Sequence, residues 1–201
     1  MRIGILGSGA VGQALTRGYS AHGHDVRIGT RKQDLDGLPI GTPTEVAGWA
    51  EIVVLAVSGA AAEELTRSLA EPLADKVVID ATNPLDYTAG APRLFVGHDD
   101  SLGERVQQAA PRSRVVKAYN IVGNTLMVDP QLPDGPPTML IGGNDDDAKS
   151  IVANLLQETG WDVADLGGIE ASRYLEPVAM AWVLYGMRNG AWEHAFRLLR
   201  S

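Results

Sequence analysis

The stretch RIGILGSGAVG at residues 2–12 places an apolar run directly before a glycine-rich turn, and an amphipathic segment continues from the turn to Ala21. This order predicts a strand, a turn and a helix. In such a unit each glycine of the pattern G-x-G-x-x-G has a physical purpose: the first permits the tight turn, the second lets a pyrophosphate approach the backbone, and the third lets helix and strand pack closely. The negative charge of the ligand then lies at a helix N-terminus. The stretch predicts a dinucleotide site, and its candidate residues are Gly7, Ser8, Gly9, Ala10, Val11 and Gly12.

The end of the second expected strand, residues 25–29, indicates which dinucleotide binds. For NAD, an acidic residue is expected about 20 residues beyond the glycines, where it would bind the ribose hydroxyls. Here the chain instead reads Thr30, Arg31 and Lys32. A hydroxyl and two cations suit a 2′-phosphate, which predicts NADP as the cofactor. Asp34 and Asp36 follow closely enough to reach a ribose, so strict preference for NADP over NAD stays open.

Length and composition narrow the class of protein. The chain has 201 residues, of which 45% are hydrophobic, and this suits one α/β domain with a short appendage. We expect a dinucleotide domain over residues 1–168 and C-terminal helices over 169–201 that complete an acceptor pocket within the same compact unit. The net charge of −8 argues against a nucleic-acid partner, and with no cysteine the chain has no disulfide or thiolate site. Lacking a long apolar run or a leader pattern, it is expected in the cytoplasm, without a membrane partner.

Strand-like and helix-like segments alternate along the whole chain. After the first unit, apolar runs predict strands over residues 52–57, 76–81, 114–118, 138–142 and 161–164. Helical patterns lie between them over residues 43–49, 59–71, 101–110 and 145–159, the first opened by a Thr42–Glu45 capping box. The alternation predicts a doubly wound parallel sheet of the Rossmann type with a C-terminal helical extension.

Ligands of such sheets bind beyond the carboxyl ends of the strands, which singles out three further segments. Residues 56–59 offer Ala56 and Val57 to the adenosine side of a dinucleotide, and residues 80–85 and 117–123 follow the next strands. The carboxamide of a nicotinamide needs a donor and an acceptor, which Asn83 or the backbone near Ala118 could supply. Two alternatives stay open: Asn83 and the proline after it form a plain turn, and Lys117 points into solvent from its strand end rather than acting in catalysis.

These motifs together resemble one family. Residues 7–12, 29–31, 80–84 and 117–120 are similar to the NADPH-dependent deazaflavin reductases, the coenzyme F(420):NADP oxidoreductase family, and the likeness continues through residues 175–182 and 196–200. The resemblance implies an enzyme that transfers a hydride between the nicotinamide C4 and the C5 of a deazaflavin. It also implies that residues 8–11 cradle the pyrophosphate, that Thr30 and Arg31 hold the 2′-phosphate, and that Ala118 orients the nicotinamide. Because some relatives use a flavin or an unknown acceptor, the resemblance indicates the cofactor better than the substrate.

Hydride transfer between stacked rings depends on alignment rather than on an acid, a base or a metal. In agreement, the sequence offers no convincing catalytic dyad. His22 and His24 lie in the expected turn after the first helix, and the carboxylates near His98 and at residues 145–147 suit helix starts better than a metal site. We therefore predict no catalytic side chain and no metal ion.

The segment from Leu175 to Met187 is apolar on nearly every side of a helix, so something must cover it. It closes the sheet, or it forms a homodimer interface that also builds the wall of the acceptor pocket. The family resemblance favours the homodimer, and we expect Pro84, Asn120 and Trp182 to bind the acceptor. Two other functions stay open: a non-catalytic sensor of NADP(H), and an NADPH-dependent reductase of an unknown small substrate. The long loop of residues 82–92, suited to line a second pocket, favours the enzyme.

Overall fold

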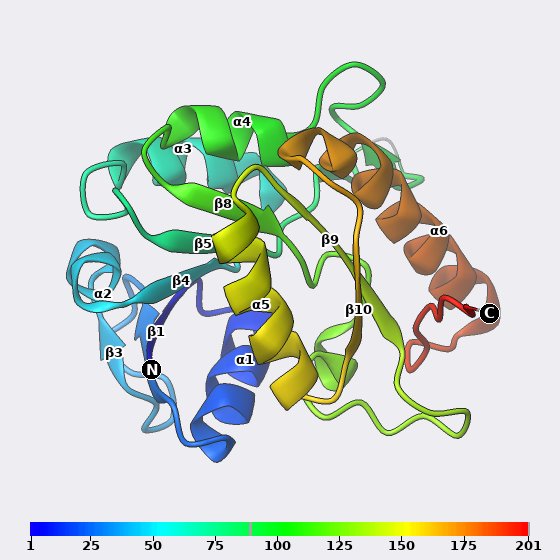
Figure 1. The fold of residues 1–201 in the computed structure, drawn as a ribbon, viewed down its shortest axis with the longest axis horizontal. Coiled ribbons are helices and arrows are strands. Elements are labelled where there is room, and N and C mark those ends of the chain that lie inside the picture. Colours follow the sequence, from blue (N-terminus) through cyan, green and yellow to red (C-terminus); the bar gives the residue numbers. More distant parts are fainter. Residues whose placement is uncertain (89, 201) are drawn as a thin grey trace.

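The computed structural model describes residues 1–88 and 90–200, and it has a central sheet between two layers of helices (Figure 1). Ala89, in the loop expected to line a second pocket, and Ser201, at the end of the C-terminal segment, lie outside the described residues. The strands are β1 Arg2–Leu6, β2 Asp25–Gly29, β3 Ile40–Gly41, β4 Ile52–Leu55, β5 Val77–Asp80, β6 Leu85–Asp86, β7 Arg93–Leu94, β8 Arg114–Lys117, β9 Thr138–Gly143 and β10 Asp162–Asp165. The helices are α1 Ala10–Ala21, α2 Pro43–Trp49, α3 Gly59–Ser68, α4 Leu102–Ala109, α5 Asp146–Glu158 and α6 Ser172–Asn189, with 3-10 turns η1 Asn124–Leu126 and η2 Ile169–Ala171.

The sheet has the strand order of a dinucleotide-binding domain. Its neighbours run β10-β9-β8-β5-β4-β1-β2-β3, and β6 and β7 form a separate hairpin. β1 pairs in parallel with both β2 and β4, so the strand order reverses at β1. The glycine turn that follows β1 therefore opens at the switch point, where doubly wound sheets bind their ligands.

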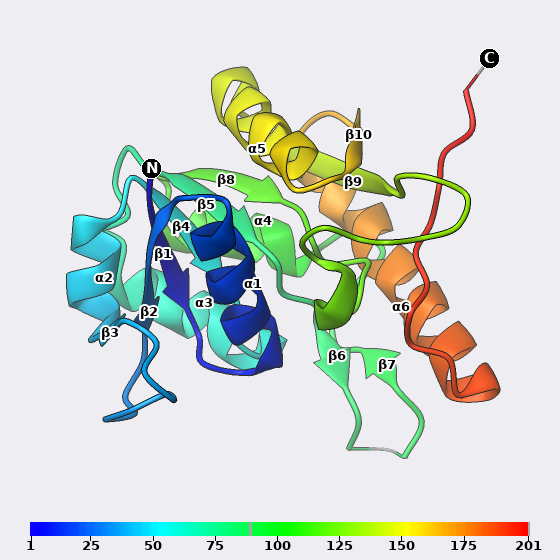
Figure 2. The ribbon, with the colours of Figure 1, turned by 90° about the horizontal axis from the view of Figure 1, so that it is seen from below.

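Two apolar clusters hold the helices on opposite faces of the sheet. One cluster includes Leu15 of α1 and Leu155 of α5, and the other includes Val46 of α2, Ala62 of α3 and Val106 of α4. Figures 1 and 2 show the same division, with α1 and α5 on one side and α2, α3 and α4 on the other. The Rossmann-type fold predicted from the alternating pattern is confirmed.

One departure from the expected parallel sheet concerns β9 and β10. β8 pairs with β9 in the antiparallel sense, whereas β9 and β10 are parallel to each other. A parallel neighbour needs a crossover long enough to return to the other edge of the sheet, usually a helix. Between β8 and β9 the chain has only the short turn η1, so it enters β9 from the edge at which β8 ended.

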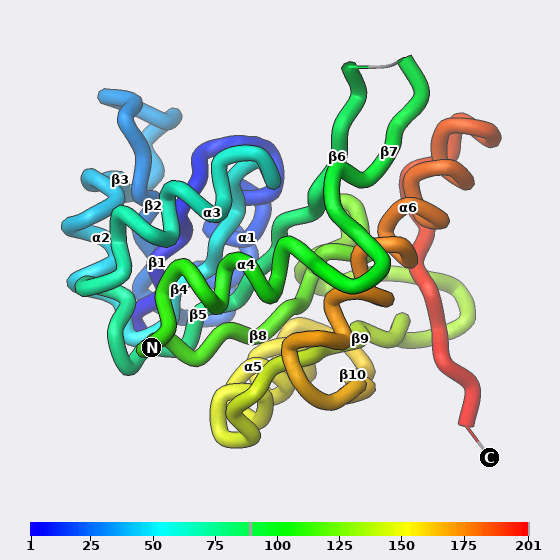
Figure 3. The backbone as a smooth tube through the Cα atoms, turned by 90° about the horizontal axis from the view of Figure 1, so that it is seen from above, coloured from blue at the N-terminus to red at the C-terminus, as the bar shows by residue number. Residues whose placement is uncertain are grey.

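A second departure concerns the C-terminal segment, where helices were expected. α6 ends at Asn189, and the next residue, Gly190, adopts the left-handed conformation with φ 62° that typically stops a helix. The rest of the tail is irregular and runs back beside α6, as Figures 2 and 3 show. It joins the start of β9, where the Thr138 N–H donates to the Phe196 carbonyl at 2.9 Å and the Leu198 N–H to the Thr138 hydroxyl at 3.0 Å.

The helices lie where the sequence predicts them, and only their first or last residues differ. α2 begins with the expected capping box, in which the Thr42 hydroxyl accepts from the Glu45 N–H and the Glu45 carboxylate accepts from the Thr42 N–H. α3 ends at Ser68, three residues before the predicted end. Among the described helices, none has the length and apolar character needed to cross a membrane.

Candidate dinucleotide site

The glycines of the turn after β1 differ in what surrounds them. Gly7 has φ +128°, and a Cβ there would lie 2.2 Å from the Ala56 carbonyl oxygen. A Cβ on Gly12 would lie 2.0 Å from the Gly7 carbonyl oxygen, whereas a Cβ on Gly9 meets no atom within 4 Å. Gly7 and Gly12 are thus needed for the fold itself, and Gly9 leaves open space in front of the backbone. This space is the cradle that a pyrophosphate needs, so the turn fits a dinucleotide.

The N-terminus of α1 is left available to an anion. Its N-cap is Gly9, which has no side chain to accept a hydrogen bond, and the first turn carries no acidic residue. The first N–H groups of a helix lack partners within the helix, and the helix dipole makes this end positive. A phosphate beside Gly9 would supply both the acceptors and the negative charge.

A cleft of about 520 Å³ extends from the turn along the ends of β1, β2 and β4. It is lined by Gly7, Ser8, Gly29, Thr30, Arg31, Pro43, Val57, Ala61, Glu64, Leu65 and Ser68. The Thr30 hydroxyl donates to the Ser8 hydroxyl at 3.1 Å and accepts from the Lys32 N–H at 3.1 Å. The side chains of Arg31 and Lys32 are exposed at this end. The structure therefore brings together the two segments that the sequence assigned to the pyrophosphate and the 2′-phosphate.

The cleft also contains α3 residues that the sequence analysis missed. Ala61, Glu64, Leu65 and Ser68 lie on one face of α3. Leu65 and Val57 give the cleft an apolar part, which suits an adenine ring, and Glu64 adds a hydrogen-bond acceptor to its lining. Their spacing of three and four residues would have shown that they share a helix face, but no sequence signal indicates that this face turns toward the glycine turn.

Asn83 and Asn120 follow the carboxyl ends of β5 and β8, an edge of the sheet that we call the rim, and they bind each other. The Asn83 side-chain amide donates to the Asn120 carbonyl at 2.6 Å, and the Asn120 amide donates to Asn83 Oδ1 at 3.1 Å and to the Leu175 carbonyl at 3.0 Å. Asn120 is 4% exposed, and Asn83 is half-buried. The Asn83 side chain thus belongs to a network that joins the rim to α6, and it meets a nicotinamide only with its remaining lone pair or N–H.

The other residues expected near the nicotinamide and the acceptor are also buried. Ala118 is fully buried, and its N–H donates to the Asp80 carbonyl at 3.2 Å. Pro84 is buried, and its carbonyl accepts from the Phe95 N–H at 2.9 Å. Trp182 is covered by the C-terminal tail: its ring stacks on His194 with centroids 4.7 Å apart, and its indole N–H donates to the His194 carbonyl. Roles of these residues in binding remain predictions, and contact between Trp182 and an acceptor would require the tail to move.

Lys117 does not point into solvent, as one interpretation of the sequence held, but is fully buried. Its ammonium lies 3.0 Å from a carboxylate oxygen of Asp80 and 3.0 Å from one of Glu176, both also buried. Burial acts to lower the pKa of Lys117, but the two carboxylates outweigh it, so the pKa is raised and the side chain stays charged. Asp80, Lys117 and Glu176 form a closed ionic cluster, which we call the buried triad.

The sequence analysis missed Asp80 and Glu176 as partners of Lys117. A signal existed, because each of the three charges lies within an apolar run: residues 77–80, 114–118 and 175–183. Charged residues are almost never fully buried unless they are paired. The register of β5 and β8, which places Asp80 opposite Lys117, and the position of α6 decide which charges meet.

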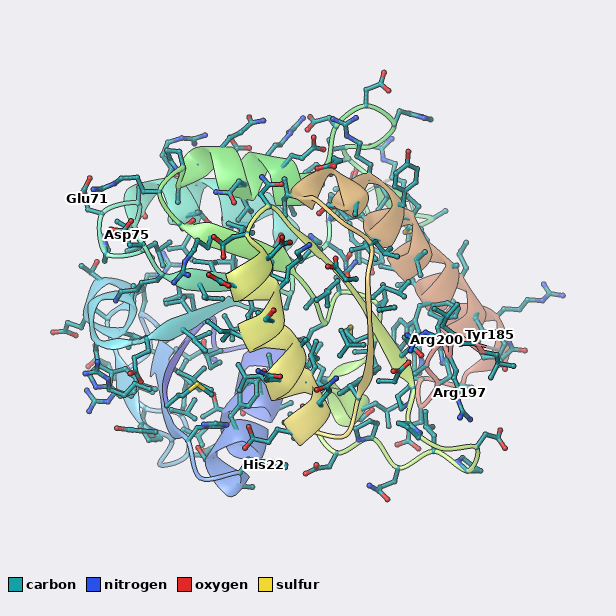
Figure 4. All side chains as sticks on the ribbon, in the orientation of Figure 1. His22, Glu71, Asp75, Tyr185, Arg197 and Arg200 are labelled. Atoms are coloured by element: carbon teal, nitrogen blue, oxygen red, sulfur yellow. The ribbon has the colours of Figure 1, made fainter. Side chains whose placement is uncertain are left out.

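The histidines and the acidic run lie in the structural positions expected for them. His22 is at the end of α1 and binds the Asp129 carboxylate at 3.0 Å, well away from the tail residues Arg197 and Arg200 (Figure 4). Asp145 caps α5 by accepting from the Ala148 N–H at 2.7 Å. Across residues 1–88 and 90–200, no group of three or more His, Asp and Glu side chains is placed to hold a metal ion.

Known proteins resemble this chain in both sequence and fold. The profile of the family described as NADP oxidoreductase, coenzyme F420-dependent, matches residues 2–84, which include the glycine turn, the Thr30–Arg31 pair and Asn83. A crystal structure from an Arthrobacter species, provisionally assigned as an F420-dependent NADP-reductase, is 35% identical and covers 100% of both chains with a TM-score of 0.93. The chain belongs to this family. It is a family of NADP-linked oxidoreductases, as expected from the motifs at residues 7–12 and 29–31.

Curated relatives differ in how much of their length this chain spans. The F420-dependent NADP reductase of Methanothermobacter marburgensis is 28% identical, with 94% of each chain covered. The metalloreductase STEAP3 of Rattus norvegicus is 27% identical over 89% of this chain, but the chain spans only 36% of the length of STEAP3. Proteins similar to this chain therefore include one that is much longer than the chain itself.

Proposed function

We propose that this protein transfers a hydride between NADP(H) and a deazaflavin such as coenzyme F(420). The observation that carries the proposal is the open cradle at Gly9, which continues into the cleft of Thr30 and Arg31. A dinucleotide with its pyrophosphate on the N-terminus of α1 and its 2′-phosphate beside Arg31 would direct the nicotinamide toward the rim at Asn83 and Asn120. The names of the Arthrobacter and Methanothermobacter proteins support the deazaflavin as acceptor.

The chemistry asks little of the protein beyond alignment. In the reducing direction, the C4 hydride of NADPH would pass to C5 of the deazaflavin, and a proton from water would complete the reduced ring. Holding the two rings in contact supplies most of the rate enhancement in such a reaction. In this proposal the protein's residues bind and orient: the turn at residues 7–12 holds the pyrophosphate, and the Asn83–Asn120 pair keeps the rim beside the nicotinamide in place.

The assay that tests the proposal mixes the purified protein with NADPH and coenzyme F(420) and follows the visible absorbance of the deazaflavin. Riboflavin, FMN and FAD serve as parallel acceptors. We expect rapid bleaching of the deazaflavin and much slower reduction of the flavins. Faster reduction of a flavin would replace the deazaflavin as acceptor. Tight binding of NADPH without reduction of any of the four would contradict the proposed activity and favour a sensor or a reductase of another small substrate.

The assignment of the 2′-phosphate site predicts a change in cofactor preference. Arg31→Ala is expected to weaken NADPH binding by about 1.5–3 kcal/mol, or roughly 10- to 150-fold, because the variant loses hydrogen bonds to a charged group. NADH, which lacks the 2′-phosphate, should bind almost as before. Titration calorimetry of both cofactors measures the difference. The matched control is Arg17→Ala, which also removes an exposed arginine, in this case one on α1. Equal losses for both cofactors would refute the role of Arg31.

We also propose that the protein is a homodimer assembled through α6. The support is apolar surface on this helix: Leu184 is 52% exposed, Tyr185 54% and Met187 52%. Since Trp182 is covered by the tail of its own chain, these residues rather than Trp182 would make the contact. Leu184→Glu is expected to shift sedimentation velocity from dimer to monomer, whereas Leu166→Glu, another exposed leucine away from α6, should not. A wild-type protein that sediments as a single monomeric species would contradict the dimer.

A further inference from the structure

The buried triad connects α6 to the rim of the dinucleotide site. Glu176 lies on α6, Lys117 at the end of β8 and Asp80 at the end of β5. The chain of contacts continues past Asp80, whose Oδ1 accepts from the Thr82 N–H at 2.9 Å and from the Thr82 hydroxyl at 2.6 Å. Thr82 is 3% exposed and immediately precedes Asn83 on the rim. The Glu176 side chain of α6 is thus linked to the rim through Lys117, Asp80 and the buried Thr82.

A second connection runs parallel to the first. The Leu175 carbonyl, one residue before Glu176, accepts from the Asn120 amide, which also donates to Asn83 Oδ1. The two connections begin at adjacent residues of α6 and end at adjacent residues of the rim. Together they hold Thr82 by its backbone N–H and hydroxyl and Asn83 by its side chain.

The Asn83 backbone in turn lies against the start of α3, the helix whose residues from Ala61 onward line the cleft. A Cβ added to Gly59, the first residue of α3, would lie 2.0 Å from the Asn83 carbonyl oxygen. This close approach leaves no space for the rim to shift toward α3 without displacing the turn that carries Val57. The position of the rim is therefore set from α6 on one side and limited by α3 on the other.

Stability alone does not account for three buried charges. Replacing a buried ion pair by apolar side chains of similar volume is often neutral or stabilising, because desolvation offsets the attraction. Here one lysine neutralises only one of the two carboxylates. The remaining negative charge of Glu176 is met by the N-terminus of α4, where Leu102 N–H and Gly103 N–H donate at 3.1 and 3.0 Å. Such an arrangement defines positions in a way that an apolar contact would not, since each partner must lie within hydrogen-bond distance.

We propose that Lys117 is a positioning residue for the nicotinamide half of the cofactor, acting through Asp80 and Thr82 and tied to α6 by Glu176. The inference rests on the proposed NADP(H) site. In it, the glycine turn and Arg31 bind the adenosine half independently of the triad, while the triad holds the rim against which the nicotinamide lies. Weakening the triad should consequently affect one half of the cofactor and spare the other.

The test compares NADPH with adenosine 2′,5′-bisphosphate, which has the adenosine half and no nicotinamide. The variant is Glu176→Gln, which keeps the shape of the side chain and one oxygen acceptor for α4. We expect the bisphosphate Kd to stay within about twofold, the fluorescence anisotropy of the bound nicotinamide to fall, and kcat to drop by about tenfold to a hundredfold, as a misplacement near 1 Å would cause. Lys149→Met is the matched control, because Lys149 is also nearly buried and bound to two carboxylates, Asp146 and Asp165, on α5 and β10.

Other outcomes are also decisive. If Glu176→Gln does not fold, Thr82→Val serves instead, because it removes only the hydroxyl bond to Asp80. It should likewise lower the anisotropy of the bound nicotinamide and leave the Kd of the bisphosphate within about twofold. Unchanged anisotropy and kcat in a folded variant would overturn the proposal, as would a parallel loss of affinity for both ligands, which would indicate a purely structural role. If the wild-type protein reduces none of the acceptors, the proposed activity fails, but the comparison of NADPH with the bisphosphate still tests the positioning role. A lower nicotinamide anisotropy with an unchanged bisphosphate Kd would then support the positioning role without any measurement of turnover.

Discussion

Replacing Lys117 with methionine is expected to lower the free energy of unfolding by about 3–5 kcal/mol, the usual cost of removing one partner from a buried ion pair. The methionine would fill most of the volume of the lysine side chain, but Asp80 and Glu176 would face each other without a cation. Both carboxylates are buried, so water could not take over the role of the ammonium. Urea denaturation followed by circular dichroism measures the change.

The control for this prediction is Lys149→Met. Lys149 is 8% exposed and contacts two carboxylates, but the Asp146 side chain is 95% exposed and the Asp165 side chain 48%. These partners regain water when the lysine is lost, so a cost of about 1 kcal/mol or less is expected. Similar losses for the two variants would show that burial of the carboxylates does not decide the energetics of the Lys117 cluster.

Gly7→Ala is expected to destabilise the fold by about 2–4 kcal/mol, because strain and overpacking act at the same residue. The backbone there has φ +128°, which residues other than glycine rarely adopt. The added Cβ would also lie 2.2 Å from the Ala56 carbonyl oxygen. Both obstacles involve backbone atoms, which cannot rotate away as a side chain could. A lower midpoint in urea denaturation, with an unchanged slope, is the expected measurement.

Gly9→Ala separates folding from binding in the same turn. Its φ is −78°, and an added Cβ meets no atom within 4 Å, so stability should change by about 1 kcal/mol or less. The methyl group would occupy the space assigned to the pyrophosphate, and we expect NADPH binding to weaken at least about tenfold, equivalent to about 1.4 kcal/mol. A variant that binds NADPH like the wild type would place the pyrophosphate elsewhere.

The features that could be predicted from the sequence are those that depend on neighbouring residues. The glycine turn, the capping box at Thr42 and the alternation of strands and helices all arise from local geometry, and the structure confirms them. The direction of β9 was predicted wrongly, as parallel to β8, because both directions have the same apolar pattern. It follows from the path of residues 118–137, which contains no crossover helix.

The candidate site divides in the same way. Thr30 and Arg31 could be assigned to the 2′-phosphate, because the distance in sequence from the glycine turn to the end of β2 nearly determines their place. The α3 side of the cleft, the Asn83–Asn120 pair and the covering of Trp182 by the tail could not, because they join residues from distant parts of the chain.

By itself, the sequence determined the Rossmann-type fold and indicated that the glycine turn and the Thr30–Arg31 segment lie at one cleft, since both follow from turn geometry and the spacing within one strand–helix–strand unit. Only the tertiary structure decided the fate of Lys117. Its charge lies at a strand end that would face solvent in an isolated sheet, and the packing of α6 over that end turns it into a buried partner of Asp80 and Glu176. Burial and pairing depend on which surfaces meet, and no local pattern of residues contains that information.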